Sequence, residues 1–294
     1  MTYRDRVGVL PLDKPEGPTS HDVVAMARRA LGERRVGHTG TLDPFASGLL
    51  LLCVGRATRL AQFLTDLDKT YDATARLGVA TDTEDREGAE LSRSERWQEI
   101  TPQGLEAALG KLRGSILQTP PQFSAKKVGG EAAYRLARRG ESVTLDPRSV
   151  TVHELDVVDF DPPDVGFRVR CSSGTYVRSL ARDLGESLGV GAHLTRLRRT
   201  HVGPFSVSSA VTLEGLKDPD GMSKSWIDPL DAVAHLPRVD VAAEEVEELQ
   251  HGRPVSAEGS LGPGPVIAAH GEVLVAVGEV RDARFHPRKV FVHG

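Results

Sequence analysis

The stretch YDATARLGV, residues 71–79, decides the fold class, because its side chains alternate between apolar and polar. This alternation predicts a strand with one buried and one exposed face. FRVRCS, residues 167–172, has the same pattern. Strands of a parallel sheet covered on both faces would be apolar throughout. We therefore predict an α+β fold with a mixed, largely antiparallel central sheet flanked by helices, not a doubly wound sheet.

Other segments extend this pattern. VGVLPLDKP (7–15) and the apolar run LLLLCV (49–54) are predicted strands, and Pro11 in the first predicts a sheet edge or a bulge. A helix is predicted after Thr19, which can cap it together with Asp22, and Gly32 is expected to end it. Further helices are predicted at 58–68, from Thr101-Pro102 to Gly114, and at 175–189.

The chain is long enough for two domains. It has 294 residues, about twice the usual size of one domain. Periodicity weakens and prolines recur between 208 and 237, so the boundary is placed near 235. The first domain then spans residues 1–235. Residues 236–294 hold short strands separated by Gly and Pro, which predicts a small β-barrel or sandwich.

Several classes of protein lack support in the sequence. No apolar segment is long enough to cross a bilayer, and the N-terminus has no signal-peptide pattern, so we expect a cytoplasmic protein without a membrane partner. Cys53 and Cys171 form no CxxC or Cys/His cluster, which argues against structural zinc and predicts two buried thiols. The phosphate-binding glycine motifs and the GxSxG motif are absent.

The charge pattern is compatible with a polyanionic partner. The net charge of −4 alone disfavours nucleic acid, but cations cluster at 28–35, 126–148 and 196–199. Acidic residues concentrate elsewhere, at 82–90 and 244–248. For any single basic cluster, a solvated surface is the simpler alternative.

RVGHTGTLDPFASGLL, residues 35–50, surrounds Asp43 with glycines and Pro44. A turn needs two to four residues, whereas this segment runs for about a dozen. It is either a long surface loop or a backbone shaped to hold Asp43 against a large partner. Pro44 restricts Asp43 to extended conformations, and the glycines permit close approach of backbone or ligand.

Four blocks of sequence combine glycines with polar and charged residues: DKPEGPTSHD (13–22), GHTGTLDPFASGLL (37–50), KTYDATARLG (69–78) and CSSGTYVRSLARDLG (171–185). In this order they resemble successive motifs of the TruB family of tRNA pseudouridine synthases. PPQFSAKKVGGEAAYRLARRG (120–140) resembles the start of that family's RNA-gripping insertion, here about 120–148. LTRLRRTHVGPFS (194–206) resembles the motif that closes the uridine pocket, and the tail is similar to a short PUA-type RNA-binding domain.

The resemblance implies the pseudouridine synthase fold and isomerisation of uridine 55 in the T-loop of tRNA. The target base must be flipped out of its loop, at a cost of a few kcal/mol. It also implies a monomer that binds the tRNA T-arm and needs no cofactor, metal or obligatory protein partner. Asp43 is the implied essential carboxylate. It can attack the ribose C1′ or take the C2′ proton, and both routes stay open.

The resemblance also assigns the surrounding residues. Arg178 is expected to pair with Asp43, and Tyr71 to stack on the flipped uracil and relay the C5 proton. The implied substrate-binding residues are Lys14, His38, Asp85, Tyr176 and Leu197, of which Tyr176 and Leu197 are pocket walls and His38 props the opened T-loop. The expected RNA-backbone contacts are Arg35, Lys126, Lys127, Arg138, Arg139, Arg198 and Arg199. Taken alone, Tyr71 is a core aromatic residue and Arg178 a surface arginine.

Two alternatives share this fold. One is a dyskerin-type synthase that uses a guide RNA and protein partners, against which the compact length and the insertion argue. The other is a tRNA-folding chaperone without catalysis, against which the presence of Asp43, Tyr71 and Arg178 argues. A carboxylate-nucleophile hydrolase is disfavoured, because the sequence lacks a motif for a partner carboxylate.

Overall fold

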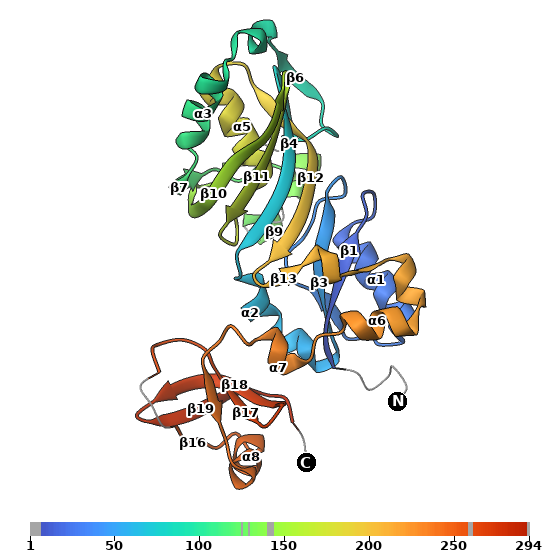
Figure 1. The fold of residues 1–294 in the computed structure, drawn as a ribbon, viewed down its shortest axis with the longest axis vertical. Helices are drawn as coiled ribbons and strands as arrows, with labels where there is room; N and C mark the ends of the chain where they lie inside the picture. The colour runs from blue at the N-terminus through green and yellow to red at the C-terminus, as the bar shows by residue number, and fades with distance from the viewer. Residues whose placement is uncertain (1–6, 125, 129, 140–143, 258–260, 293–294) are drawn as a thin grey trace.

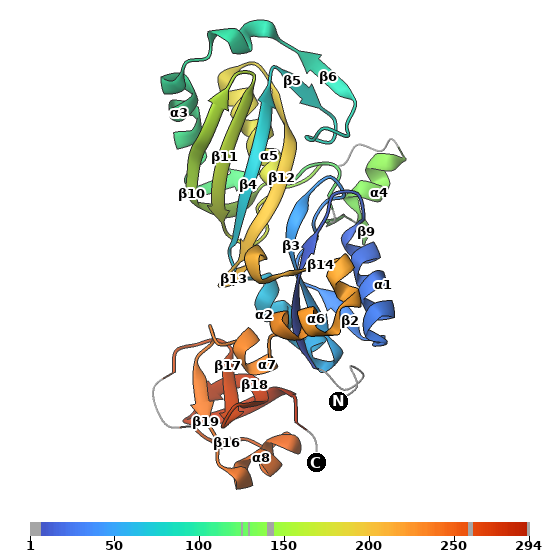
Figure 2. The same ribbon diagram turned by 45° about the vertical axis from the view of Figure 1, so that its right-hand side comes forward.

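The computed structural model describes residues 7–124, 126–128, 130–139, 144–257 and 261–292. Within these residues, ten strands form the main sheet. They are β1 (Gly8–Lys14), β2 (Val36–His38), β3 (Ser47–Val54), β4 (Lys69–Leu77), β7 (Gly114–Gln118), β10 (Arg148–Asp161), β11 (Asp164–Cys171), β12 (Ala192–Val202), β13 (Phe205–Ser206) and β14 (Val211–Thr212). The main path runs β14-β1-β3-β12-β4-β11-β10-β7, and β2 and β13 pair at its side (Figures 1 and 2).

Helices and smaller strands surround this sheet. The helices are α1 (Ser20–Leu31), η2 (Gly55–Leu60), α2 (Ala61–Thr65), η3 (Glu95–Glu99), α3 (Pro102–Gly110), α4 (Ala133–Arg138), α5 (Val177–Leu188), η4 (Val207–Ser209), η5 (Glu214–Lys217), α6 (Pro219–Ser225) and α7 (Pro229–Ala232). Two small hairpins pair β5 (Val79–Thr81) with β6 (Glu90–Arg93) and β8 (Lys127–Val128) with β9 (Glu131–Ala132). The predicted RNA-gripping insertion contains β8, β9 and α4.

The sheet is mixed, as predicted. β14 runs parallel to β1, and β12 runs parallel to β3. The pairs β1–β3, β12–β4, β4–β11, β11–β10 and β10–β7 are antiparallel. Antiparallel pairing thus dominates the half of the sheet formed by β12, β4, β11, β10 and β7.

β4 confirms the prediction from alternation. Tyr71, Ala73 and Leu77 are buried, and they belong to the core beneath α3 and α5. On the opposite face, Asp72 pairs with Arg168 of β11 at 2.7 Å, where both side chains reach solvent. Figures 1 and 2 show α3 and α5 on one side of this part of the sheet.

β3 is buried on both faces, which explains its unbroken apolar sequence. One face packs with α1, β1 and η5, while the other packs with η2, α2 and part of the C-terminal sheet. Leu50 and Leu52 belong to the first cluster, and Leu49, Leu51 and Cys53 to the second. Burying each leucine stabilises the fold by roughly 1.5–3 kcal/mol.

Local signals set most helix ends. The Thr19 side chain accepts from the Asp22 N–H, and the Asp22 carboxylate accepts from the Thr19 N–H, which completes a capping box. Gly32 ends α1 in the left-handed conformation. Two predictions need correction. The third helix ends at Gly110 and not at Gly114, which begins β7, and the predicted helix at 58–68 is split between η2 and α2.

Pro11 lies opposite Leu51 in the full ladder between β1 and β3. Val9 exchanges hydrogen bonds with Ile227 on the other side of β1, at 2.8 and 2.9 Å. By alternation, the Pro11 nitrogen points to that side, away from β3. On that side of β1, β14 pairs only with Leu12 and Asp13. The N–H that Pro11 lacks would therefore not have bonded to β3.

The C-terminal region forms a second sheet. Its strands are β15 (Arg238–Asp240), β16 (Val255–Ser256), β17 (Val266–His270), β18 (Val273–Arg281) and β19 (Arg284–Val290), beside α8 (Ala243–Gln250). They follow the order β15-β17-β18-β19-β16. The sheet curls into a half-barrel in Figure 1, whereas a small β-barrel or sandwich was predicted.

Side chains and backbone join the two sheets. Lys289 donates to the Arg59 carbonyl and to Gln62 Oε1, both at 2.8 Å. Arg59 in turn donates to the Val290 carbonyl at 2.6 Å. One apolar cluster includes residues of β3, α2, β17 and β18, so the half-barrel packs directly on the main body.

Candidate active site

The loop between β2 and β3 presents Asp43. The backbone before Asp43 is fixed by Ser20 of α1, whose Oγ accepts from the Leu42 N–H at 2.9 Å and donates to its carbonyl at 3.0 Å. After Asp43, the Pro44 carbonyl accepts from the Gly17 N–H at 2.8 Å. The Asp43 side chain is 33% exposed, so a ligand can reach a carboxylate whose backbone is held on both sides.

Arg178 of α5 grips this carboxylate with two nitrogens. Nε lies 2.9 Å from Oδ2 and Nη2 lies 3.3 Å from Oδ1. The arrangement is the fork geometry of a bidentate arginine–carboxylate pair. The predicted pairing of Arg178 with Asp43 is therefore present in the structure.

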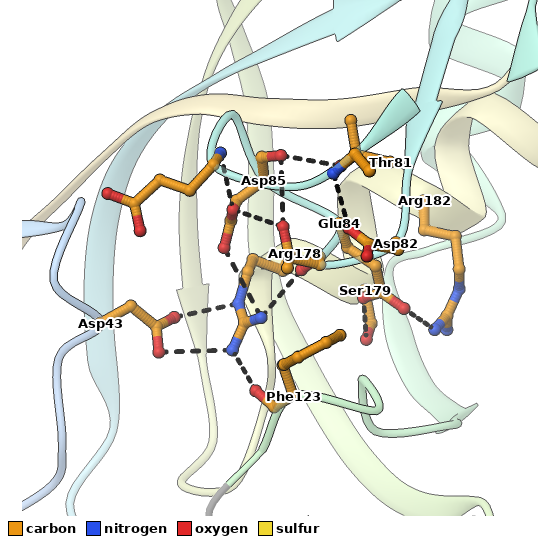
Figure 3. A network of polar contacts seen from close by, with 12 residues as sticks. Asp43, Thr81, Asp82, Glu84, Asp85, Phe123, Arg178, Ser179 and Arg182 are labelled. Atoms are coloured by element: carbon orange, nitrogen blue, oxygen red, sulfur yellow. Dashed lines mark hydrogen bonds and ion pairs between the residues drawn. The ribbon is translucent and has the colours of Figure 1, made fainter. Parts of the chain in front are cut away.

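Two backbone carbonyls and a second carboxylate fix the Arg178 guanidinium. It donates to the Thr83 carbonyl at 2.8 Å and to the Phe123 carbonyl at 2.9 Å, and its Nη1 lies 3.6 Å from Asp85 Oδ2. Asp85 is fixed by the Thr83 hydroxyl at 2.6 Å and the Glu87 N–H at 3.0 Å. Figure 3 shows the guanidinium between Asp43 and Asp85. With 5% exposure, Arg178 is not the surface arginine that its helix pattern alone predicts.

A second acidic group supports the same segment and was missed at the level of sequence. Glu84 accepts from the Ser179 hydroxyl at 2.9 Å and pairs with Arg182, so residues of α5 hold both Glu84 and Asp85 (Figure 3). The signal was the spacing of Arg178, Ser179 and Arg182, which places them on one side of a helix. The acidic stretch 82–90, expected apart from the basic residues, faces them.

Burial raises the pKa of Asp43 above its ordinary value, and the Asp85 charge adds to this rise. The Arg178 guanidinium opposes it most strongly, with a smaller contribution from Lys14. Ionised Asp43 therefore depends on Arg178, since no other cation acts on it as strongly.

Tyr71 and Leu197 lie on neighbouring strands of the same core. Tyr71 is 8% exposed and Leu197 is 6% exposed, and both pack in the cluster that contains Leu42 and Phe45 of the Asp43 loop. Burial raises the pKa of the Tyr71 phenol, and the Arg199 guanidinium opposes this rise. The structure thus brings Tyr71 and Leu197 to the loop that carries Asp43.

Tyr176 and His38 lie at the borders of this region. Tyr176 precedes α5, and its backbone N–H and carbonyl bond to the amide of Gln118 at 2.8 and 3.1 Å. The half-buried His38 ring meets the His21 ring edge to face at 5.5 Å. Burial lowers the pKa of His38 to about 4, so its imidazole is neutral at pH 7. Its Nδ1 is buried and has no hydrogen-bond partner among the described residues.

The structure contradicts a direct substrate contact for Lys14. This side chain is completely buried, and its ammonium donates to the carbonyls of Pro15 at 2.8 Å, Pro18 at 2.9 Å and Pro44 at 3.4 Å. Burial lowers the pKa of Lys14 to about 8, while the Asp43 charge works against that change. Lys14 therefore braces the segment after Asp43 from inside the protein.

The structure also contradicts an RNA-backbone contact for Arg199, which is 1% exposed. Other predicted backbone residues reach solvent but have protein partners. Arg198 forms a bidentate pair with Asp13 at 3.0 and 2.7 Å, and Arg139 pairs with Glu131. Arg35 lies 3.8 Å from Glu33, and Lys126 donates to the Asp146 carbonyl at 3.2 Å. The side chains of Lys127 and Arg138 lie outside the described residues.

The cysteines are free and buried, as predicted. Burial raises the pKa of Cys53 to about 12 and that of Cys171 to about 11, so both are neutral thiols at pH 7. Among the described residues, no cluster of three or more His, Cys, Asp or Glu side chains is arranged to hold a metal ion. In the same part of the chain, no helix has the length and apolarity needed to cross a membrane.

The sequence matches two family models that define the class of protein. Residues 28–177 match the model described as TruB family pseudouridylate synthase (N terminal domain). Residues 178–234 match the model described as tRNA pseudouridylate synthase B C-terminal domain. The first match contains Asp43, Tyr71 and Asp85, and the second begins at Arg178. The chain is thus a pseudouridine synthase by family.

Whole-chain comparisons give the family. The tRNA pseudouridine synthase B of Thermobifida fusca (strain YX) is 49% identical over 97% of this chain and 98% of that protein. A solved Cbf5-Nop10-Gar1 complex contains a chain that is 29% identical, with a TM-score of 0.76 over 99% of this chain and 85% of that chain. An H/ACA RNP bound to a substrate RNA matches at 28% identity and a TM-score of 0.76, over 98% and 86%. The chain belongs to the TruB family.

Proposed function

We propose that this protein isomerises uridine 55 to pseudouridine in the T-loop of tRNA. The observation that carries the proposal is the Asp43 carboxylate, solvent-accessible and held at 2.9 Å by a buried arginine. Relatives that match nearly the whole chain are named tRNA pseudouridine synthase B. Family and geometry therefore support the same reaction.

The ionised Asp43 carboxylate starts the reaction on a flipped uridine. In one route its oxygen bonds to C1′ while the C1′–N1 bond breaks and the electron pair leaves with the uracil. In the other route it takes the C2′ proton and the same bond breaks, which gives a glycal. Both routes need a carboxylate that is charged and oriented, and Arg178 supplies the counter-charge and the orientation.

The detached uracil turns and is rejoined to the ribose through C5. The ring of Tyr71 stacks on the base, a contact worth roughly 1–3 kcal/mol. Its oxygen then takes the C5 proton. Leu197 and Tyr176 form walls of the uracil pocket, and neutral His38 contacts the opened loop of the RNA. Asp85, which was expected to bind substrate, is only 5% exposed and acts instead through Arg178, because their charged groups lie 3.6 Å apart.

Exposed cations of the main body contact the T-arm backbone. Arg35, Arg139 and Arg198 have side chains that reach solvent. Their present acidic partners are exchangeable, because exposed ion pairs are worth only about 0–1 kcal/mol. Phosphates can therefore replace them. The protein acts as a cytoplasmic monomer without an obligatory partner.

The division at residue 235 gives a catalytic domain, 1–235, and a PUA-like RNA-binding domain, 236–294. The half-barrel has an apolar cluster of its own, which includes Val239, Leu249, Val275 and Phe285. This separate core supports a domain with its own fold.

A second candidate is a guide-dependent synthase that acts with protein partners. It is favoured by the likeness to Cbf5, which was solved together with Nop10 and Gar1. The stand-alone enzyme is preferred because relatives at higher identity are named tRNA pseudouridine synthase B.

One assay tests the proposal. Purified protein is mixed with an unmodified tRNA transcript carrying [5-³H]uridine, without guide RNA or partner protein. We expect one tritium released per tRNA, and no release from a transcript with cytidine at position 55. Absence of release from the first transcript would exclude the stand-alone enzyme and leave the guide-dependent synthase or a chaperone.

A further inference from the structure

Arg199 is the largest fully buried residue among those that the structure describes, and it is 1% exposed. Its Nε donates to the Leu49 carbonyl at 2.7 Å, and Nη2 donates to the Gly40 carbonyl at 3.1 Å. Carbonyl groups satisfy donors but do not neutralise a charge, and burying a cation costs several kcal/mol. A neutral side chain could fill the same volume, so the buried charge itself needs a reason.

The two carbonyls bracket Asp43 along the chain. Two glycines of this segment lie next to position 199, Gly48 against its backbone and Gly40 at ordinary contact distance from its guanidinium. Gly48 has φ +104°, and a Cβ there would lie 2.2 Å from the Arg199 carbonyl oxygen. Gly40 has φ +85°, and its Cβ would lie 3.5 Å from Arg199 Nη1. The close approach that Gly48 permits is therefore to the backbone of β12, while the guanidinium clamps the loop through carbonyls on both sides of Asp43.

Arg199 also lies beside Tyr71. The two are direct partners in the antiparallel ladder of β12 and β4, so their side chains share one face of the sheet. The charged or titratable groups that act on the Tyr71 phenol are Arg199 of β12, Cys171 of β11 and Asp43 of the loop. Of these, only Arg199 opposes the increase that burial causes in the pKa of Tyr71.

We propose that Arg199 is a positioning residue for the reaction: its guanidinium clamps the Asp43 loop through Gly40 and Leu49 and places a positive charge beside the Tyr71 oxygen. One buried side chain thereby positions Asp43 of the β2–β3 loop and Tyr71 of β4. This inference rests on the proposed function of Asp43 and Tyr71.

The charge matters at the last step. The Tyr71 phenol first loses its proton to water, which leaves a phenolate beside the guanidinium. The C5–H bond then breaks, its electron pair restores the C5–C6 double bond of the uracil, and the proton passes to the phenolate oxygen. Tyr71 ends as a neutral phenol. Arg199 stabilises the phenolate on which this transfer depends.

The test replaces Arg199 and measures the effect on the ionisation of Tyr71 and on the reaction rate that depends on Asp43. Arg199→Met removes the charge and the donors, while Arg199→Lys keeps the charge but cannot form the two-pronged contact. Arg168→Met, on the open face of the sheet, is the matched control. Tyr71 is replaced by 3-fluorotyrosine, whose phenol is more acidic, in each protein. Its ionisation is followed by ¹⁹F NMR, and single-turnover rate and tRNA affinity are measured on the unlabelled proteins.

We expect Arg199→Met to raise the titration midpoint at position 71 by about one pH unit or more. Its single-turnover rate should fall at least about tenfold, since general base catalysis contributes about 10²–10⁴, while tRNA affinity stays within about threefold. Arg199→Lys should titrate near the wild-type pH and still lose rate, because the loop clamp is lost. Arg168→Met should match the wild type in each measurement.

A folded Arg199→Met protein with wild-type rate overturns the inference, whether or not its titration shifts. An unshifted titration removes the role toward Tyr71 and overturns the inference as stated. If Arg199→Met does not fold, a wild-type rate in Arg199→Lys overturns it. Failure of the proposed function looks different, because the wild-type protein would then be inactive on tRNA.

Discussion

Replacing Arg178 with methionine leaves Asp43 and Asp85 without the cation that lies between them. The lost contacts are the fork on Asp43, at 2.9 and 3.3 Å, and the contact with Asp85 at 3.6 Å. Burial already raises the pKa of Asp43, and Arg178 is the strongest opposing influence. The pKa of Asp43 should therefore rise further in Arg178→Met.

The size of the change follows from the geometry. An opposite charge within 4–6 Å lowers a carboxyl pKa by about 1–3 units, and each unit corresponds to about 1.4 kcal/mol. Losing one partner of a buried pair also destabilises a fold by about 3–5 kcal/mol. Asp43 reaches solvent, so the lower end of that range applies to Arg178→Met.

The assay is the single-turnover rate of pseudouridine formation between about pH 5 and pH 9. Both routes use ionised Asp43, so the rate falls as the pH drops through its pKa. A raised pKa makes this fall begin at higher pH. We expect the acidic limb to move upward by about 1–3 pH units in Arg178→Met, and by less in Arg178→Lys, which keeps a charge.

Arg168→Met is again the control, because its partner Asp72 lies on the open face of the sheet. The fall of its rate at low pH should coincide with that of the wild type. Circular dichroism must show that each variant is folded at the pH values used. An acidic limb at the wild-type pH in folded Arg178→Met would refute the claim that Arg178 keeps Asp43 ionised.

Two further substitutions test neighbouring parts of the site. Gly48→Ala places a methyl group 2.2 Å from the Arg199 carbonyl at φ +104°, so thermal unfolding should show a loss of more than about 1 kcal/mol, and an unchanged melting temperature would contradict the close packing of β12 on the loop. Tyr71→Phe keeps the stacking ring but loses the hydroxyl, so single-turnover assays should show a loss of about 10²-fold or more on ordinary tRNA. On tRNA with 5-fluorouridine at position 55 there is no C5 proton to remove, and the mutant should react or become trapped as fast as the wild type. Equal losses on both RNAs would end the proton-relay role.

The sequence predicted best those elements whose side-chain pattern records their burial. β4 alternates because one face meets the helices and the other meets solvent, and β3 is apolar throughout because both faces are covered. The capping residues of α1 act locally, so Thr19 and Gly32 could be assigned without tertiary information. The end of α3 could not, because a glycine such as Gly114 serves equally to close a helix or to begin a strand.

The candidate site residues were chosen from family motifs and not from the properties of single residues. Asp43, Tyr71 and Arg178 were selected by resemblance, while their residue types alone suggested a turn, a core aromatic and a surface cation. Lys14 and Arg199 were assigned by resemblance to contacts with the RNA, and no local pattern indicated that these charged side chains are buried, since such side chains are normally exposed. The carbonyls that hold Arg199 are 150 and 159 residues away in the sequence, beyond the reach of any local pattern.

The central claim is that Asp43 performs the chemistry on tRNA. The most direct test is tritium release from [5-³H]uridine-labelled tRNA by Asp43→Asn under single-turnover conditions, at protein concentrations that saturate the RNA. Asparagine keeps the shape of the side chain and removes its charge, so tRNA affinity should stay within a few-fold of wild type. We predict no measurable release above background. Release at more than about a thousandth of the wild-type rate would contradict the account, because loss of a catalytic group typically costs more than that.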